Sequence, residues 1–354
     1  MAKAKVTISD VAREAGVALG TVSNALNHPE KVRPETLQTI NEAIQKLGYA
    51  PNQSARVLAG GQNASFGLVL PSLDHGISLQ IANGANAEAR KHGYGLLIAN
   101  TDNDDIHEDR YLRYFMGTQM AGILVQPMSV YGWKPSVTPS FPTVYLDFHS
   151  DEDGYYVAAD NEAQGRLIAQ HAASCGARHV LAFGANDFEK LGLRLKGIRE
   201  ELELHPDIEL EVLDRGSWNL AADGYEIGAE AADRPEGSRP DFIIGITDIL
   251  AAGAISGILA SGLTVPGDIR VAGCDGNPLA WMGPVPLTTI APVGYEIGRR
   301  GVQYLMRQIE ADRREEHALP TANHQQLIKP FLMQRASTVP DAALRSTDML
   351  NAVV

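Results

Sequence analysis

The first fifty residues carry apolar side chains at helical spacing in three short segments. In the first two segments the apolar positions are Ile8, Val11, Ala12 and Ala15, followed by Val22, Ala25 and Leu26. Thr7 and Asp10 have the spacing of a capping box, which starts a helix at Ile8, and Gly16 suits the end of that helix. The pattern predicts helices over about 8–15 and 19–26, joined by a short glycine-containing turn as in a helix-turn-helix unit.

A third helix is predicted from Pro34, a residue suited to a first helical turn, to the residue before Gly48. Its apolar face consists of Leu37, Ile40, Ala43, Ile44 and Leu47. Three such helices can enclose a small core. From this pattern alone, a DNA-binding head and a plain helical bundle are equally good interpretations.

Beyond residue 61, short apolar runs alternate with amphipathic stretches. The runs typical of buried strands are 66–70, 95–99, 122–125, 180–183, 210–213, 242–246 and 269–273. Helices are expected at 78–92 and 106–116, and each is followed by a glycine. This alternation predicts an α/β protein, in which the three-helix head precedes a body of two similar subdomains with doubly wound parallel sheets.

Length and composition fit that organisation. The 354 residues provide two or three domains of roughly 100 to 200 residues, and 44% hydrophobic with 21% charged residues is typical of a folded chain. The net charge is −13, yet residues 1–60 contain seven basic and five acidic side chains. A weakly cationic head on an acidic body is consistent with DNA contact at one end, although the charge alone does not establish it.

Other classes of protein find little support in the sequence. Cys175 and Cys274 lie far apart, which indicates a reducing compartment and two buried, inert thiols. No secretory signal is visible at the N-terminus, so we expect a cytoplasmic protein. The longest uncharged stretch, 249–267, contains serines and several glycines and is too short for a comfortable transmembrane span.

Catalytic motifs are not found either. The sequence contains no nucleophile elbow, dinucleotide-binding glycine motif, phosphate-binding loop, zinc-protease motif or paired-cysteine motif, so we expect neither an enzyme nor a cofactor. His149 near Asp151 is a weak candidate for a metal site. The acidic run 102–105 favours a solvated loop over a calcium site, because the spacing of a calcium loop is missing.

Two segments of the head carry a specific resemblance. DVAREAGVALGTVSNALN and the later KLGYAPNQSARVLAGG resemble the DNA-binding head and hinge of the LacI/GalR family of bacterial transcription regulators. The resemblance implies that the helix over 19–26 enters the major groove of DNA, with Leu19, Gly20 and Asn24 choosing bases. It places DNA contacts in the head at Thr7, Ala18, Leu19, Gly20, Thr21, Ser23 and Asn24.

The resemblance also implies a hinge helix over 52–58, which orders on DNA when two subunits pair. Its contact residues would be Asn52, Ala55, Arg56 and Leu58. Paired Leu58 side chains would wedge into the minor groove and kink the duplex. The alternative is that Leu58 is a linker residue packed on the body.

The head departs from the family pattern at two positions. Ala18 replaces the usual serine at the start of the recognition helix, which removes a phosphate-contacting cap. Asn24 replaces the usual arginine late in that helix. Because arginine suits guanine and asparagine suits adenine, we expect an operator that differs at this base pair, unless Asn24 contacts only phosphate.

Polar residues follow several predicted strands of the body, where open parallel sheets bind ligands. Asp147 and Asp275 precede no obvious helix and are candidate ligand contacts, whereas Asp248 lies directly before a helix and is interpreted as its cap. The segments VAADNEAQG, GLRLKG, ITDILAAGA, LTVPGDIRVAGCDGNP and PLTTIAPVGYEIGRRG resemble the family's effector-binding domain, which is similar to periplasmic sugar-binding proteins.

This second resemblance implies an effector site for a carbohydrate, with carboxylates and a guanidinium for hydroxyls and an indole for the sugar ring. The implied contacts are Ser72, Asp147, Arg194, Trp218, Thr247 and Asp275. Arg194 could instead be a surface or ion-pair arginine, and Trp218 could belong to the core. Thr247 replaces the family's usual asparagine, and the usual aromatic near Ile77 is missing, so the identity of the effector stays open.

We therefore expect an effector-responsive, sequence-specific transcriptional regulator, most simply a repressor of carbohydrate genes that binds a palindromic operator as a homodimer. The expected domains are a head (1–50), a hinge and linker (51–61), an effector-binding and dimerisation body (62–336) and a tail (337–354) without the heptads of a tetramerising coiled coil. Alternatives are a regulator that responds to a nucleobase or other non-sugar metabolite, and a sugar-binding protein without a DNA role. A sugar-modifying enzyme would need catalytic residues that we do not find.

Overall fold

The computed structural model describes residues 6–50, 63–73, 76–127, 141–185, 189–214, 221–290, 293–313 and 323–340. The chain divides into two compact units, which are the head (Met1–Asn63) and the body (Ala64–Val354).

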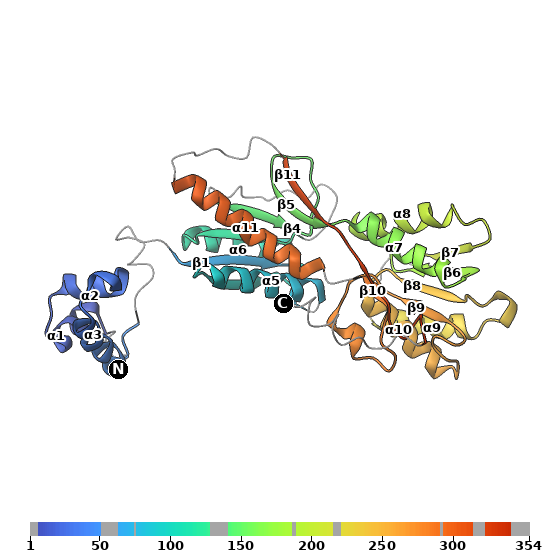
Figure 1. The fold of residues 1–354 in the computed structure, drawn as a ribbon, viewed down its shortest axis with the longest axis horizontal. Coiled ribbons are helices and arrows are strands. Elements are labelled where there is room, and N and C mark those ends of the chain that lie inside the picture. The colour runs from blue at the N-terminus through green and yellow to red at the C-terminus, as the bar shows by residue number, and fades with distance from the viewer. Residues whose placement is uncertain are drawn as a thin grey trace. The chain divides into compact units, whose positions relative to one another are not determined.

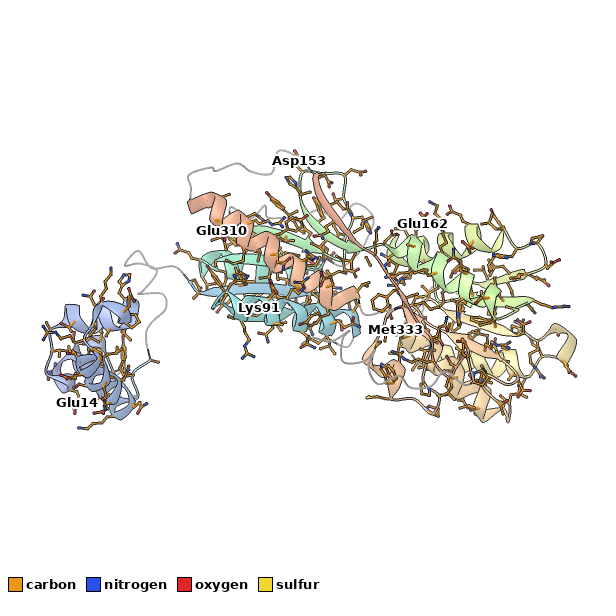
Figure 2. The ribbon with its side chains drawn as sticks, viewed as in Figure 1. Glu14, Lys91, Asp153, Glu162, Glu310 and Met333 are labelled. Carbon is orange, nitrogen blue, oxygen red and sulfur yellow. The ribbon has the colours of Figure 1, made fainter. Side chains whose placement is uncertain are left out.

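The head consists of three helices around a small apolar core, as the spacing predicted. The helices are α1 (Ile8–Ala15), α2 (Leu19–Asn27) and α3 (Pro34–Leu47), with a 3-10 turn, η1 (Pro29–Lys31), between α2 and α3. The capping box at Thr7 starts α1, and Gly16 (φ 65°) and Gly48 (φ 63°) end α1 and α3 in the left-handed conformation that glycine adopts without strain. Lys46 on α3 forms an ion pair with Glu14 on α1, with Nζ and Oε1 2.5 Å apart. Glu14 is labelled in Figure 2.

The body contains two halves, each built on its own parallel sheet (Figure 1). The first half has six parallel strands, in spatial order β11 (Asn323–Ile328), β5 (Gly154–Ala159), β4 (Thr143–Leu146), β3 (Gly122–Val125), β1 (Ser65–Leu70) and β2 (Gly95–Asn100). Its helices are α5 (Gly76–Lys91), α6 (Asp105–Gly117) and α11 (Val293–Arg313). Helices α5 and α11 pack side by side, and both contribute to the core that covers one face of the sheet.

The second half has four parallel strands, in spatial order β7 (Glu209–Leu213), β6 (His179–Phe183), β8 (Phe242–Gly245) and β9 (Arg270–Ala272). Its helices are α7 (Asn161–Ser174), α8 (Glu189–Leu202), α9 (Ala221–Ala232) and α10 (Asp248–Ala260), with 3-10 turns η2 (Glu236–Ser238) and η3 (Pro278–Trp281). A short antiparallel pair, β10 (Thr289–Ile290) with β12 (Leu332–Met333), completes this half.

Small residues set the distance between the paired helices of the second half. A Cβ atom on Gly165 of α7 would lie 1.9 Å from the carbonyl oxygen of Arg194 on α8, and one on Gly197 would lie 2.1 Å from that of Glu162, labelled in Figure 2. The backbones of α7 and α8 can approach this closely only because these glycines have no side chain. This packing fixes α8, which carries Arg194, against the start of α7.

The chain passes between the halves three times, after β5, after β10 and after β11. Sequence patterning predicted the seven strands that it singled out and the doubly wound class, and both are confirmed. The return of α11 and β11 to the first half was not predicted, because nothing in local periodicity encodes which sheet a later element joins. Buried chain also continues through Ser337 and Thr338, two residues past the expected end of the body.

Three smaller expectations can be compared with the structure. Cys274 is buried, whereas Cys175 at the end of α7 is only half-buried, so the expectation that both are buried was wrong for Cys175. In the acidic run 102–105, Asp104 caps α6 by accepting from the backbone N–H groups of Ile106 and His107. Across the part of the chain that the structure describes, no helix has the length and apolar character needed to cross a membrane.

Candidate functional site

The outward face of α2 is the first candidate site. Val22 and Ala25 are buried in the core of the head, whereas Gly20 and Asn24 are exposed and Leu19 keeps 50% of its surface in solvent. An apolar side chain this exposed on a nine-residue helix is available to a partner. Thr21 and Ser23 are half-buried.

The start of α2 has no side-chain cap, as the alanine at position 18 predicted. Ala18 is the N-cap residue in extended conformation, and no side-chain hydrogen bond is made there. Thr7, in contrast, is engaged in its capping box, because its hydroxyl donates to Asp10 Oδ2 at 2.7 Å and accepts from the Asp10 N–H at 3.4 Å. The predicted hinge contacts Asn52, Ala55, Arg56 and Leu58 lie outside the described residues.

In the body, the predicted effector residues follow the carboxyl ends of strands from both sheets. Ser72 follows β1, Asp147 follows β4, Thr247 follows β8 and Asp275 follows β9. Ser72 and Asp147 are buried, and Asp147 has a positive φ of 53°, a conformation that costs energy in a non-glycine residue and is typical of functional positions. Trp218 lies outside the described residues, so its predicted role stays a prediction.

Arg194 of α8 is the centre of this second candidate site. It is 3% exposed, so it is not a surface arginine, and its Nη1 donates to Asp275 Oδ1 at 2.7 Å and to the Ile246 carbonyl at 2.8 Å. Its Nε donates to Asn161 Oδ1 at 3.0 Å. Burial alone would lower the pKa of the guanidinium, but the carboxylate of Asp275, with a further contribution from Asp147, outweighs burial and raises this pKa.

Asp248 binds the loop that carries Asp275 and does not cap its own helix. The N-cap of α10 is Thr247, which makes no side-chain cap bond, so the cap interpretation of Asp248 was wrong. The Asp248 carboxylate instead accepts from the backbone N–H of Asp275 (3.2 Å), the N–H of Asn277 (2.6 Å) and the Thr289 hydroxyl (2.5 Å). Its own N–H donates to Asp275 Oδ2 at 3.1 Å, so each aspartate holds the backbone of the other.

The electrostatics of this aspartate pair reflect its burial. Burial, followed by the nearby Asp275 carboxylate, raises the pKa of Asp248 well above its ordinary range. The donors from Thr289, Asp275 and Asn277 act in the opposite direction and stabilise the carboxylate. Asp248 is therefore a buried, well-bonded residue that positions the loop after β9.

A second buried chain of hydrogen bonds orients Asp147. The Ser78 hydroxyl on α5 donates to Gln126 Oε1 at 2.9 Å, and Gln126 Nε2 donates to Asp147 Oδ2 at 3.5 Å. Both Ser78 and Gln126 are buried. With Arg194 and Asp275, this arrangement provides carboxylates and a guanidinium whose remaining hydrogen-bonding capacity suits a ligand that carries several hydroxyl groups.

Comparison with known protein families decides the class. Residues 7–52 match the model of bacterial regulatory proteins of the lacI family, and residues 169–338 match a periplasmic binding protein-like domain. The chain therefore carries a head of the lacI family of bacterial regulatory proteins and a periplasmic binding protein-like domain. Its named relatives are transcriptional regulators and not enzymes.

Named relatives match this chain over most of its length. Catabolite control protein A of Staphylococcus xylosus is 29% identical over 312 residues, covering 87% of this chain and 93% of the relative. The ribose operon repressor of Halalkalibacterium halodurans is 29% identical over 308 residues, covering 86% and 90%. The lac repressor dimer, solved bound to operator and an anti-inducer, shares the fold with a TM-score of 0.78 at 24% identity, covering 95% of this chain and 99% of that chain.

Three residues of the body site, Gln126, Asn161 and Ser78, were not predicted from the sequence. Gln126 directly follows β3, so the strand-end argument that found Asp147 could have found it too. Asn161 stands in the segment VAADNEAQG, which was noted only for its resemblance. Ser78 gave no signal, since a serine in the first turns of an amphipathic helix has no distinguishing pattern.

Proposed function

We propose that this protein is an effector-responsive transcriptional repressor, which binds a palindromic operator as a homodimer and responds to a sugar or sugar derivative held in its body. The observation that carries the proposal is the exposed face of α2 in a head that matches the lacI family model. An enzyme with this body would not need such a head, and neither would a free sugar-binding protein.

In the head, we assign base recognition to Leu19, Gly20 and Asn24. All three are exposed on α2, and the space around Gly20 is open, so a base pair can approach the helix backbone there. The asparagine amide of Asn24 can donate to adenine N7 and accept from adenine N6. We assign minor-groove contacts to Leu58 and its neighbours on the resemblance alone, together with the boundaries of a hinge over 51–61.

In the body, we assign the effector to the space between the strand ends of the two sheets. Asp147, Arg194, Thr247 and Asp275 supply acceptors and donors for hydroxyl groups, and the Thr247 hydroxyl oxygen is buried without a hydrogen-bond partner among the described residues. The names of the relatives, among them a ribose operon repressor, support a carbohydrate. Because threonine offers one hydroxyl in place of an amide, the effector need not be that of any relative.

Regulation follows from the coupling of the two sites. A ligand that contacts both halves of the body favours one relative orientation of the halves. If that orientation also decides whether paired hinges can order on DNA, effector and operator change each other's affinity by the same factor.

The test uses the purified full-length chain in two steps. In vitro selection from random duplexes at modest ionic strength should recover a palindromic sequence, because a symmetric dimer reads two half-sites. Titration of that complex with pentoses, hexoses, disaccharides and nucleobases should identify a compound that changes operator affinity by roughly fivefold or more. Recovery of no sequence would overturn the DNA-binding role, and a response to nucleobases alone would replace the sugar with a non-sugar metabolite.

A further inference from the structure

Gln80 joins the two halves of the body at the effector site. It lies on α5 in the first half, and its Nε2 donates to the carbonyl oxygen of Gly276 at 3.0 Å and approaches that of Asp275 at 3.5 Å. Both carbonyls belong to the loop after β9 in the second half. The side chain is buried, so these bonds form away from bulk water, where a polar contact is costly to lose.

The loop that Gln80 contacts is held firmly from its own side. The N–H of Gly276 donates to the Thr289 hydroxyl at 3.0 Å, and the N–H of Asn277 donates to Asp248 at 2.6 Å. The Asp275 side chain is held by Arg194 at 2.7 Å. Asp275 and Gly276 therefore carry both the carboxylate that Arg194 holds and the carbonyl acceptors for Gln80.

Packing leaves Gln80 little freedom to follow a moving loop. A Cβ atom on Gly294, at the start of α11, would lie 2.8 Å from the Cβ of Gln80, so Gln80 is confined against α11. At the first residue of α5, a Cβ on Gly76 would lie within 2.0 Å of the Asn277 amide. The N-terminal turns of α5 and residues 275–277 are thus in direct contact, and a shift of either must be met by the other.

We propose that Gln80 is the positioning residue that transmits effector binding at Asp275 to α5 and so to the first half of the body. This proposal rests on the proposed function. When an effector hydroxyl replaces part of the Arg194 contact to Asp275, the loop carbonyls reorient and the Gln80 bonds are strengthened or lost. Ser78 lies two residues before Gln80 and donates a hydrogen bond to Gln126, which in turn donates to Asp147. The same turn of α5 is therefore also connected to Asp147 by hydrogen bonds.

The first experiment needs no effector. Gln80→Met keeps the volume and removes the donor, and Gln303→Met is the matched control, because Gln303 Nε2 donates to Glu88 within the first half alone. Hydrogen exchange of the backbone amides of Gly276 and Asn277 should be roughly fivefold faster in Gln80→Met than in wild type. Exchange in Gln303→Met should match wild type at this loop. Unchanged exchange in Gln80→Met would overturn the proposal.

The second experiment measures the coupling itself, on the operator and effector found as above. Wild type and Gln303→Met should show the same ratio of operator affinities with and without effector, whereas in Gln80→Met that ratio should fall by roughly fivefold while calorimetry still detects effector binding. A full ratio in Gln80→Met would overturn the proposal. If wild type responds to no compound, it is the proposed function that fails. If wild type responds and Gln80→Met keeps the full ratio, only the role of Gln80 fails.

Discussion

Arg194 and Asp275 form an ion pair in which both side chains are largely withdrawn from water, with Nη1 and Oδ1 2.7 Å apart. The two residues come from α8 and from the loop after β9, which are 81 positions apart in sequence. Neither charge is well solvated, so each depends on the other. Removing one partner of a buried pair costs more folding free energy than the intact pair contributes, because the remaining charge stays buried without compensation.

Arg194→Ala should therefore lower the free energy of unfolding by about 3 kcal/mol, as measured by urea denaturation at neutral pH. The double variant Arg194→Met with Asp275→Leu should be more stable than Arg194→Ala, because it buries no unpaired charge. Effector response should be lost in both variants. Equal stability of wild type and Arg194→Ala would contradict the buried pair.

A neutral histidine lies in the core of the second half. His171 Nε2 is 2.8 Å from the Thr338 hydroxyl, and Thr338 is 2.6 Å from the Thr288 hydroxyl, which donates to the Arg335 carbonyl. The Thr338 hydroxyl can donate to or accept from His171 Nε2, so the neutral ring has a hydrogen-bond partner in either tautomer.

This histidine should make the protein sensitive to acid. Burial, followed by the charge of Arg270, lowers the pKa of His171 from 6.5 to about 4. A lowered pKa means that its stabilising effect is complete above pH 6.5 and is lost as the pH falls toward 4. Between pH 7 and 4, wild type should lose about 2 kcal/mol more unfolding free energy than His171→Gln. His205→Gln, at a half-exposed position, is the control and should follow wild type.

The uncapped start of α2 offers a gain of stability. Ala18 is the N-cap residue and makes no side-chain bond, so Ala18→Ser should supply an acceptor for a free backbone N–H. The expected increase in unfolding free energy of the head is about 1 kcal/mol, read from the thermal unfolding of the head. Operator affinity should rise as well, since the hydroxyl can donate to a phosphate. A stability equal to that of Ala18→Gly would show that no cap bond forms.

Much of the fold could be predicted from the sequence because each element carries a local signal. The helices of the head follow from apolar spacing, from Pro34 and from the glycines that end α1 and α3, and the buried strands follow from short apolar runs. Which half α11 and β11 join is decided by packing between distant segments, and no local pattern contains that information.

The candidate site was predictable where chemistry stands at the end of a strand. Asp147 and Asp275 were found in this way, and Gln126 could have been. Asp248 was misread because an aspartate before a helix is usually its cap, whereas here three donors from residues 27 to 41 positions away claim its carboxylate. The contact of Gln80 with Gly276 joins positions 196 apart, and only the folded body brings them together.

Asn24 should choose a base of the operator. It is exposed on α2 one turn after Gly20, so its amide can reach a base edge if Gly20 lets the helix approach closely. Asn24→Arg should move the preferred base at that position from adenine toward guanine, because the arginine fork pairs with guanine O6 and N7.

Gln38→Arg adds the same charge on the exposed surface of α3 and should raise non-specific affinity without changing the preferred base. In vitro selection with wild type and both variants measures this directly. An unchanged preference in Asn24→Arg would mean that residue 24 contacts only phosphate, while a shift with Gln38→Arg would mean that added charge alone explains the effect.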